Sequence, residues 1–161
     1  GSFRFPSVTA ATHRAVAMLI DAGANHSQIH DKIKDNARPD RLKLLGIALK
    51  NMVFVTEHKA AYITISQDEL DSCNYQKGDT EGFVNFGLSV AGIEMAVLMT
   101  ESKKENMIKM SFRSKGDLAV NLFAKTYFEG GGHINAAGGK SNKSLQETEA
   151  YFLKSLATFL S

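Results

Sequence analysis

The first third of the chain shows apolar residues at helical spacing. Between a threonine cap at Thr9 or Thr12 and a stop signal at Gly23, these residues recur every three or four positions as Ala15, Val16, Leu19 and Ile20. A second helix is predicted from about His26 to Asn36. Pro39 suits the first turn of a third helix, whose apolar stripe is Leu42, Leu45 and Leu49. Three helices with modest stripes predict a connector over residues 1–50 rather than a complete domain.

From Met52 the pattern becomes that of strands. Val53–Val55 and Ala61–Ile65 read as a hairpin joined by a short polar connection at residues 57–59. Ile93–Met99 is a near-continuous apolar run, which is typical of a strand covered on both faces. The stretch Met107–Arg113 alternates strictly. Its apolar side is Ile108, Met110 and Phe112, and its polar side is Lys109, Ser111 and Arg113.

Helical segments separate these strands. One helix is predicted from Asp79 to about Ser89, and another is capped by Asp117 and carries Leu118, Leu122 and Phe123. A last helix, from about Ser144 to Leu160, is expected to bury Leu145, Phe152, Leu156 and either Phe159 or Leu160. Strand pairs interleaved with helices predict an α/β fold over residues 51–161, with a mixed β-sheet flanked by helices and a helical connector arm before it.

Composition narrows the class of protein but not its function. The 161 residues are 43% hydrophobic and 22% charged, as in ordinary globular domains. The net charge of +2 is too small to indicate nucleic-acid binding by itself, so any anion site must be local. Cys73 is the only cysteine and has no basic neighbour, which favours an inert thiol and fits a reducing cytoplasm. No apolar run approaches the roughly 18 residues of a membrane span, so no membrane partner is expected.

The most informative stretch is EGGGHINAAGGK, residues 129–140. Consecutive glycines at 130–132 suit backbone that must adopt positive φ or that a ligand approaches closely. Exposed N–H groups in such a run can hold a phosphate, and His133 adds a donor of tunable charge. The alternative is a flexible connection between a helix and a strand.

Arg113 supplies a second candidate anion contact. It ends the polar side of its strand, and the glycine run lies only one helix further along the chain. A guanidinium beside an amide-rich loop at one sheet edge would make a bidentate anion site. The alternative is a solvated strand end.

These residues also carry a family resemblance. GGGHINAAGG together with SFRSKGDLAV resembles the paired signature of the DHH-associated domain, the C-terminal module of DHH phosphoesterases. RLKLLGIAL (41–49) and DTEGFVN (79–85) resemble further segments of the branch of oligoribonucleases and 3′-phosphoadenosine-5′-phosphate phosphatases. GSFRF (1–5) resembles the tail of a segment that closes the catalytic domain, although Gly1-Ser2 can also be read as a cloning remnant. The Asp-His-His motif itself is not in the sequence.

The resemblance implies a substrate-binding role for one set of residues. In related proteins the glycine loop and its histidine contact the substrate's phosphate or terminal nucleotide, and the strand-end arginine binds phosphate. By position, these residues are Arg113, Gly130, Gly131, Gly132 and His133, with Ser114 as a weaker candidate. The family commonly has a fourth glycine where this chain has Glu129, and this carboxylate puts the loop's first contact in doubt.

No catalytic or metal-binding residue is assigned to the chain. Hydrolysis with two metal ions needs clustered carboxylates and histidines, whereas the five histidines are scattered. His26 and His30 have i,i+4 spacing, but no carboxylate stands in a zincin-like position between them, which favours a solvated helix face. Manganese is expected in the missing N-terminal DHH domain, so this chain alone should be inactive.

The resulting hypothesis is the substrate-binding part of a cytoplasmic, manganese-dependent hydrolase of short RNA or of 3′-phosphoadenosine-5′-phosphate. Enzyme alternatives are a cyclic-dinucleotide phosphodiesterase and an exopolyphosphatase. From other classes, the alternatives are a non-catalytic RNA-binding module, like the related domain of alanyl-tRNA synthetases, and a structural dimerisation domain. The expected partners are the phosphorylated substrate and the DHH domain, with a homodimer also considered.

Overall fold

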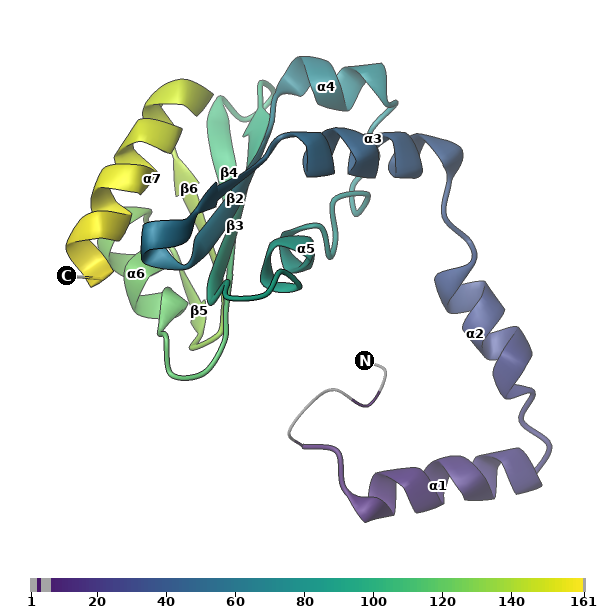
Figure 1. Cartoon of the computed structure of the whole chain (residues 1–161). Coiled ribbons are helices and arrows are strands. Elements are labelled where there is room, and N and C mark those ends of the chain that lie inside the picture. The colour runs from purple at the N-terminus through teal and green to yellow at the C-terminus, as the bar shows by residue number, and fades with distance from the viewer. Residues whose placement is uncertain (1–2, 4–6, 161) are drawn as a thin grey trace. The chain divides into compact units, whose positions relative to one another are not determined.

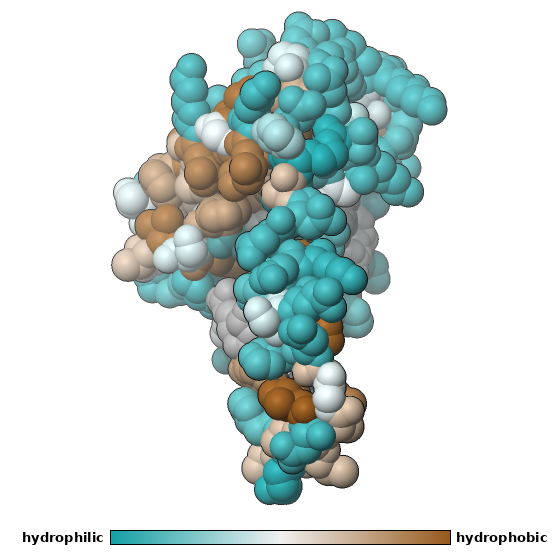
Figure 2. All heavy atoms as spheres, turned by 90° about the vertical axis from the view of Figure 1, so that its right-hand side faces the viewer, coloured by the Kyte–Doolittle hydropathy of each residue, from teal (hydrophilic) through white to brown (hydrophobic). Residues whose placement is uncertain are grey.

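A computed structural model describes Phe3 and residues 7–160, so most of the GSFRF segment lies outside the described residues. The chain forms two compact units, residues 1–38 and 39–161. The first contains α1 (Ala10–Asp21) and α2 (His26–Lys34), where helices were predicted. Neither helix buries any of its described side chains. Apolar side chains are accordingly visible on the surface in the lower part of Figure 2, at the height of α1.

Helix α3 (Pro39–Lys50) belongs to the second unit. Leu44 and Ala48 are fully buried in a core cluster, whereas Leu42 is 55% exposed and Leu49 is 43% exposed. The predicted stripe was therefore wrong at Leu42 and Leu49, because the helix turns its Leu44–Ala48 side toward the sheet. The compact unit begins at Pro39, so α3, which the sequence placed in the connector of residues 1–50, packs with the sheet instead.

The second unit is built on a six-stranded mixed sheet, which confirms the expected fold class (Figure 1). The strand order is β1-β2-β3-β4-β6-β5, and β2 pairs with β3 in parallel while the other pairs are antiparallel. The short 3-10 turn η1 (Thr56–His58) joins the first two strands. The strands are β1 (Met52–Val55), β2 (Ala60–Ile65), β3 (Met95–Ser102), β4 (Met107–Ser114), β5 (Gly131–His133) and β6 (Ala136–Ser141).

Helices cover the two faces of the sheet unequally. One face carries α6 (Val120–Tyr127) and α7 (Leu145–Leu160) across its centre (Figure 1). There the alternate residues of β4 predicted to be apolar are buried, with Phe112 at 0% exposure. The other face carries α3, α4 (Gln67–Ser72) and α5 (Val84–Leu88), packed over β2 and β3. The polar side of β4 lies on this second face.

Two predicted helix starts were wrong. Asp79 does not open a helix; its carboxylate accepts a hydrogen bond from the Gln76 backbone N–H (2.8 Å) and closes a turn, and α5 begins only at Val84. Asp117 does not cap α6. This helix begins at Val120, whose backbone N–H donates to the Ile134 carbonyl (2.9 Å). A local turn thus uses the Asp79 carboxylate that would have capped a helix, whereas a contact with the β5–β6 connection holds the start of α6.

Candidate functional site

The polar side of β4 continues across β6 and β5 as an exposed surface. Directly opposed residues of an antiparallel pair point to the same face, so the register defines which side chains share it. We call this surface the open face, and its members are Lys109, Ser111 and Arg113 of β4, Ala136, Gly138 and Lys140 of β6, and Gly131 and His133 of β5. Each of them is half-buried or exposed.

The register brings Arg113 and His133 into one row. Arg113 lies opposite Ala136 on β6, and Ala136 lies opposite His133 on β5. Two strand spacings separate the Cα atoms of Arg113 and His133 by roughly 10 Å. The residue between them in this row is Ala136, whose side chain is a single methyl group. The row Arg113–Ala136–His133 can therefore hold an anion over a small, flat floor.

The guanidinium of Arg113 is anchored by the backbone. Its Nη1 donates to the carbonyl of the preceding residue, Phe112, at 2.9 Å. A guanidinium carries five N–H donors in a planar fork, so this bond orients the group and leaves its other donors available for a ligand. Such a fork suits bidentate binding of a phosphate.

The glycine run is a strand rather than a flexible connection. Gly131–His133 forms the edge strand β5, paired with β6. A Cβ on Gly130 would lie 2.1 Å from the Gly138 carbonyl oxygen, and one on Gly132, whose φ is +147°, would lie 2.5 Å from the Ala136 oxygen. A Cβ on Gly131 would meet nothing within 4 Å. Gly130 and Gly132 are thus required for close approach of the two strands, whereas Gly131 leaves open space on the open face.

Ser114 does not join this site. It follows the apolar alternation of β4 to the opposite face and is 7% exposed. Its hydroxyl donates to the Leu118 carbonyl (2.6 Å) and accepts from Asn135 Nδ2 (3.0 Å). Asn135 also donates to the Gly116 carbonyl (2.9 Å). Ser114 and Asn135 therefore fix the β5–β6 turn, a role of Asn135 that nothing in the sequence indicated beyond its place in the motif.

A groove of about 270 Å³ opens beside Arg113. Its walls come from β3, from the polar side of β4 and from the segment before α5, and they include Thr80, Glu81, Leu98, Lys109, Ser111 and Arg113. Helix α3 braces this loop, because Arg41 donates to the Glu81 carbonyl (3.0 Å) and stacks over the Phe83 ring at 5.2 Å. Arg41, at the start of segment 41–49, therefore contacts segment 79–85, which lines the groove.

Glu129 stands in a left-handed backbone conformation, with φ of +46°. Such a conformation favours glycine, which gives a physical reason for the family's preference at this position. The Glu129 carboxylate lies 3.3 Å from the ammonium of Lys140. Its partner Lys140 lies four residues along β6 from Ala136 of that row.

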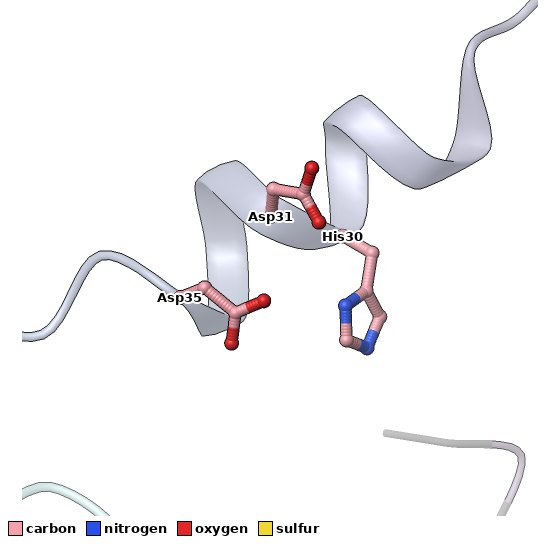
Figure 3. Close-up of side chains that lie close together, drawn as sticks. All are labelled: His30, Asp31 and Asp35. Carbon is pink, nitrogen blue, oxygen red and sulfur yellow. The ribbon is translucent and has the colours of Figure 1, made fainter.

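The described residues do not fit a two-metal hydrolytic centre. His30, Asp31 and Asp35 of the first unit bring their ligand atoms within 4.8 Å of one another (Figure 3). All three are exposed on one short helical segment, and the two carboxylates beside His30 were not among the candidates that the sequence indicated. Exposed groups of this kind are common without a metal, so we assign no metal site to them.

Comparison with known proteins places the chain in a family. Residues 52–161 match the DHHA1 domain, the DHH-associated domain. The chain belongs to the DHHA1 family. This match covers the whole sheet and helices α4 to α7 of the protein. No curated protein matches the chain.

Two solved structures share this DHHA1 fold. An exopolyphosphatase-related protein from Bacteroides fragilis is 31% identical with a TM-score of 0.91, over 98% of this chain and 46% of that one. A pGpG-specific phosphodiesterase from Vibrio cholerae is 12% identical with a TM-score of 0.59, over 98% of this chain and 52% of that one. The chain therefore spans about half the length of the solved proteins that it resembles. None of the described helices has the length and apolar character needed to cross a membrane.

Proposed function

We propose that this chain binds the phosphate of a substrate for a metal-dependent phosphoesterase. The substrate in this proposal is a short RNA oligonucleotide or 3′-phosphoadenosine-5′-phosphate. Membership of the DHHA1 family supports the enzyme class. The observation that carries the proposal is the row Arg113–Ala136–His133, in which a cation and an imidazole flank a methyl group on the open face.

The chemistry of the row suits a terminal phosphate. Arg113 would provide two parallel N–H donors, since its guanidinium is already oriented by the Phe112 carbonyl. His133, exposed on the edge strand, would provide a further donor from the other side. The groove beside Arg113 contains both apolar and hydroxyl-bearing side chains, so it can accept the nucleoside attached to that phosphate.

In this proposal a DHH domain outside the chain would carry out the hydrolytic step with bound manganese ions. The intact protein would act in the cytoplasm. The contribution of the DHHA1 domain is orientation of the substrate, and correct placement of a reacting group accounts for up to roughly 7–11 kcal/mol of barrier lowering in favourable cases. We therefore expect the isolated chain to hydrolyse none of these substrates with added manganese.

One other phosphorylated substrate has support of its own. The exopolyphosphatase-related protein from Bacteroides fragilis favours inorganic polyphosphate as an alternative. The pGpG-specific phosphodiesterase shares the fold, at an identity too low to carry its substrate to this chain. A non-catalytic RNA-binding module remains the alternative from another class.

Turnover by the intact protein tests the proposal. We would compare diribonucleotides, longer RNA, 3′-phosphoadenosine-5′-phosphate, pGpG and polyphosphate as substrates, with and without manganese. The expected result is hydrolysis of short RNA or of the phosphonucleotide, reduced strongly by Arg113→Ala and by His133→Ala. Preference for polyphosphate would favour the alternative substrate, and hydrolysis unaffected by both substitutions would show that the site is wrong.

A further inference from the structure

Two lysines face each other at the far end of the open face. Lys109 of β4 and Lys140 of β6 are direct cross-strand partners, so their side chains share the face. Like charges placed directly opposite each other are destabilising. Each lysine has a carboxylate partner, since Lys109 contacts Glu105 and Lys140 lies 3.3 Å from Glu129. The two lysines and two glutamates together carry no net charge.

Glu129 does not occupy its position for reasons of backbone or packing. Its φ of +46° is rarely adopted by residues with a side chain. Its side chain is 67% exposed, so it contributes little to the core. Exposed ion pairs also add little to stability. The effect of the carboxylate that remains is electrostatic, because its negative charge balances the positive charge of Lys140 next to β5.

The distance between the two ends of the open face relates this charge to substrate length. Arg113 and Lys109 are four residues apart on one strand, which corresponds to roughly 13 Å. This distance exceeds one nucleotide step of an extended single strand. The second phosphate of a dinucleotide whose 5′-phosphate is bound at Arg113 would therefore stop short of Lys140, whereas a third phosphate of a longer oligonucleotide could reach it.

We propose that Glu129 is a specificity-determining residue that restricts this chain to very short oligonucleotides. By cancelling the charge of Lys140, it removes the cation that a third or later phosphate would meet. The inference rests on the proposed function, because it assumes that the oligonucleotide is held at Arg113. It adds a physical reason for a length limit that Arg113 and His133 alone do not impose.

The test measures dissociation constants of 5′-phosphorylated oligoadenylates of two and five nucleotides for the whole chain. Glu129→Gln should tighten binding of the pentanucleotide about two- to fivefold, as expected for one exposed charge contact, and leave the dinucleotide unchanged. The slope of log affinity against log salt for the pentanucleotide should steepen by about 0.7, the value for one added phosphate contact on a single strand. Glu129→Gly, which also relieves the backbone conformation, should give the same gain.

Two further variants make the result specific. Adding Lys140→Gln to Glu129→Gln should abolish the gain, because no cation remains to be released. Glu57→Gln removes an exposed carboxylate in η1, beside the opposite edge of the sheet, and should leave both affinities unchanged. An equal effect of Glu57→Gln would show a general response to net charge and would overturn the proposal.

Arg113→Ala separates failure of this inference from failure of the proposed function. If Arg113→Ala weakens both oligonucleotides while Glu129→Gln changes neither, or changes both alike, only the length limit is wrong. If Arg113→Ala leaves both affinities unchanged, the phosphate site is wrong and the length limit falls with it.

Discussion

Substitution of Gly132 is expected to damage the site through the backbone. With φ of +147° and a Cβ position 2.5 Å from the Ala136 carbonyl oxygen, alanine at 132 cannot fit without movement of β5 or β6. Residues forced into backbone regions that only glycine populates cost about 1–3 kcal/mol. Gly132→Ala should therefore lower the free energy of unfolding by about that amount, or the melting temperature by about 2–4 °C per kcal/mol.

Gly131 provides a matched control on the same strand. A Cβ there would meet nothing within 4 Å, and its φ is not in the left-handed region. Gly131→Ala should be neutral or stabilising by about 0.4–1 kcal/mol, because alanine restricts the unfolded chain. Because the site needs His133 at its present register, Gly132→Ala should also weaken binding of a 5′-phosphorylated dinucleotide at temperatures where the variant is folded.

Urea unfolding followed by circular dichroism, with binding measured on the same samples, provides the assay. Equal stability of the Gly131→Ala and Gly132→Ala variants would refute the reasoning that close pairing of β5 and β6 requires glycine at 132. Reduced stability without loss of binding would show instead that the position of β5 does not matter for the ligand.

Three further predictions concern helix α3, the row of Arg113 and His133, and Tyr62. Leu44→Ala should lower the free energy of unfolding in urea by about 2–5 kcal/mol, because Leu44 is fully buried. Leu42→Ala should lower it by less than about 0.5 kcal/mol, because Leu42 is exposed. Similar small effects of both substitutions would show that α3 is not integral to the unit that contains the sheet. Ala136→Leu should fill the space between the Arg113 and His133 side chains and abolish dinucleotide binding in a titration while the chain stays folded, and unchanged affinity would argue against that row. Burial, together with the hydrogen bond to Glu149 (2.6 Å), raises the pKa of Tyr62. The stability that the raised pKa contributes is fully present below the unfolded-state pKa of about 10 and is lost as the pH rises toward the folded-state pKa. Tyr62→Phe should therefore flatten the decline of the urea midpoint above about pH 10. An unchanged slope would show that Tyr62 does not cause the decline.

The sequence predicted those parts of the fold that depend on local periodicity. The strict alternation of residues 107–113 identified both the buried side of β4 and the polar side that forms the open face. Helices α1, α2, α3 and α7 appeared where apolar spacing and caps indicated them. The short helix α4 was missed, although Ser66 and Glu69 form a capping box at its start.

The remaining errors come from contacts between distant segments. Nothing local shows that Gly131–His133 pairs with β6, so a strand was taken for a loop. Helix α3 has apolar residues on more than one side. Its packing against the sheet determines that the side carrying Leu44 is buried. The error at Ser114 has a local origin instead: it follows Arg113 in sequence, and strand alternation sends the two side chains to opposite faces.

The central claim is that Arg113 and His133 together bind a phosphate, and one titration tests it most directly. A diribonucleotide with and without a 5′-phosphate would be titrated into the chain, into Arg113→Ala and Arg113→Lys, and into His133→Ala. We predict that Arg113→Ala weakens binding of the phosphorylated form by about 1.5–3 kcal/mol, the range for a charged hydrogen bond, with only partial recovery in Arg113→Lys because an ammonium lacks the planar fork. His133→Ala should reduce the same affinity, and both substitutions should remove the preference for the phosphorylated form. Equal binding of the two dinucleotides by the unsubstituted chain, or a phosphate preference that survives both alanine substitutions, would contradict it.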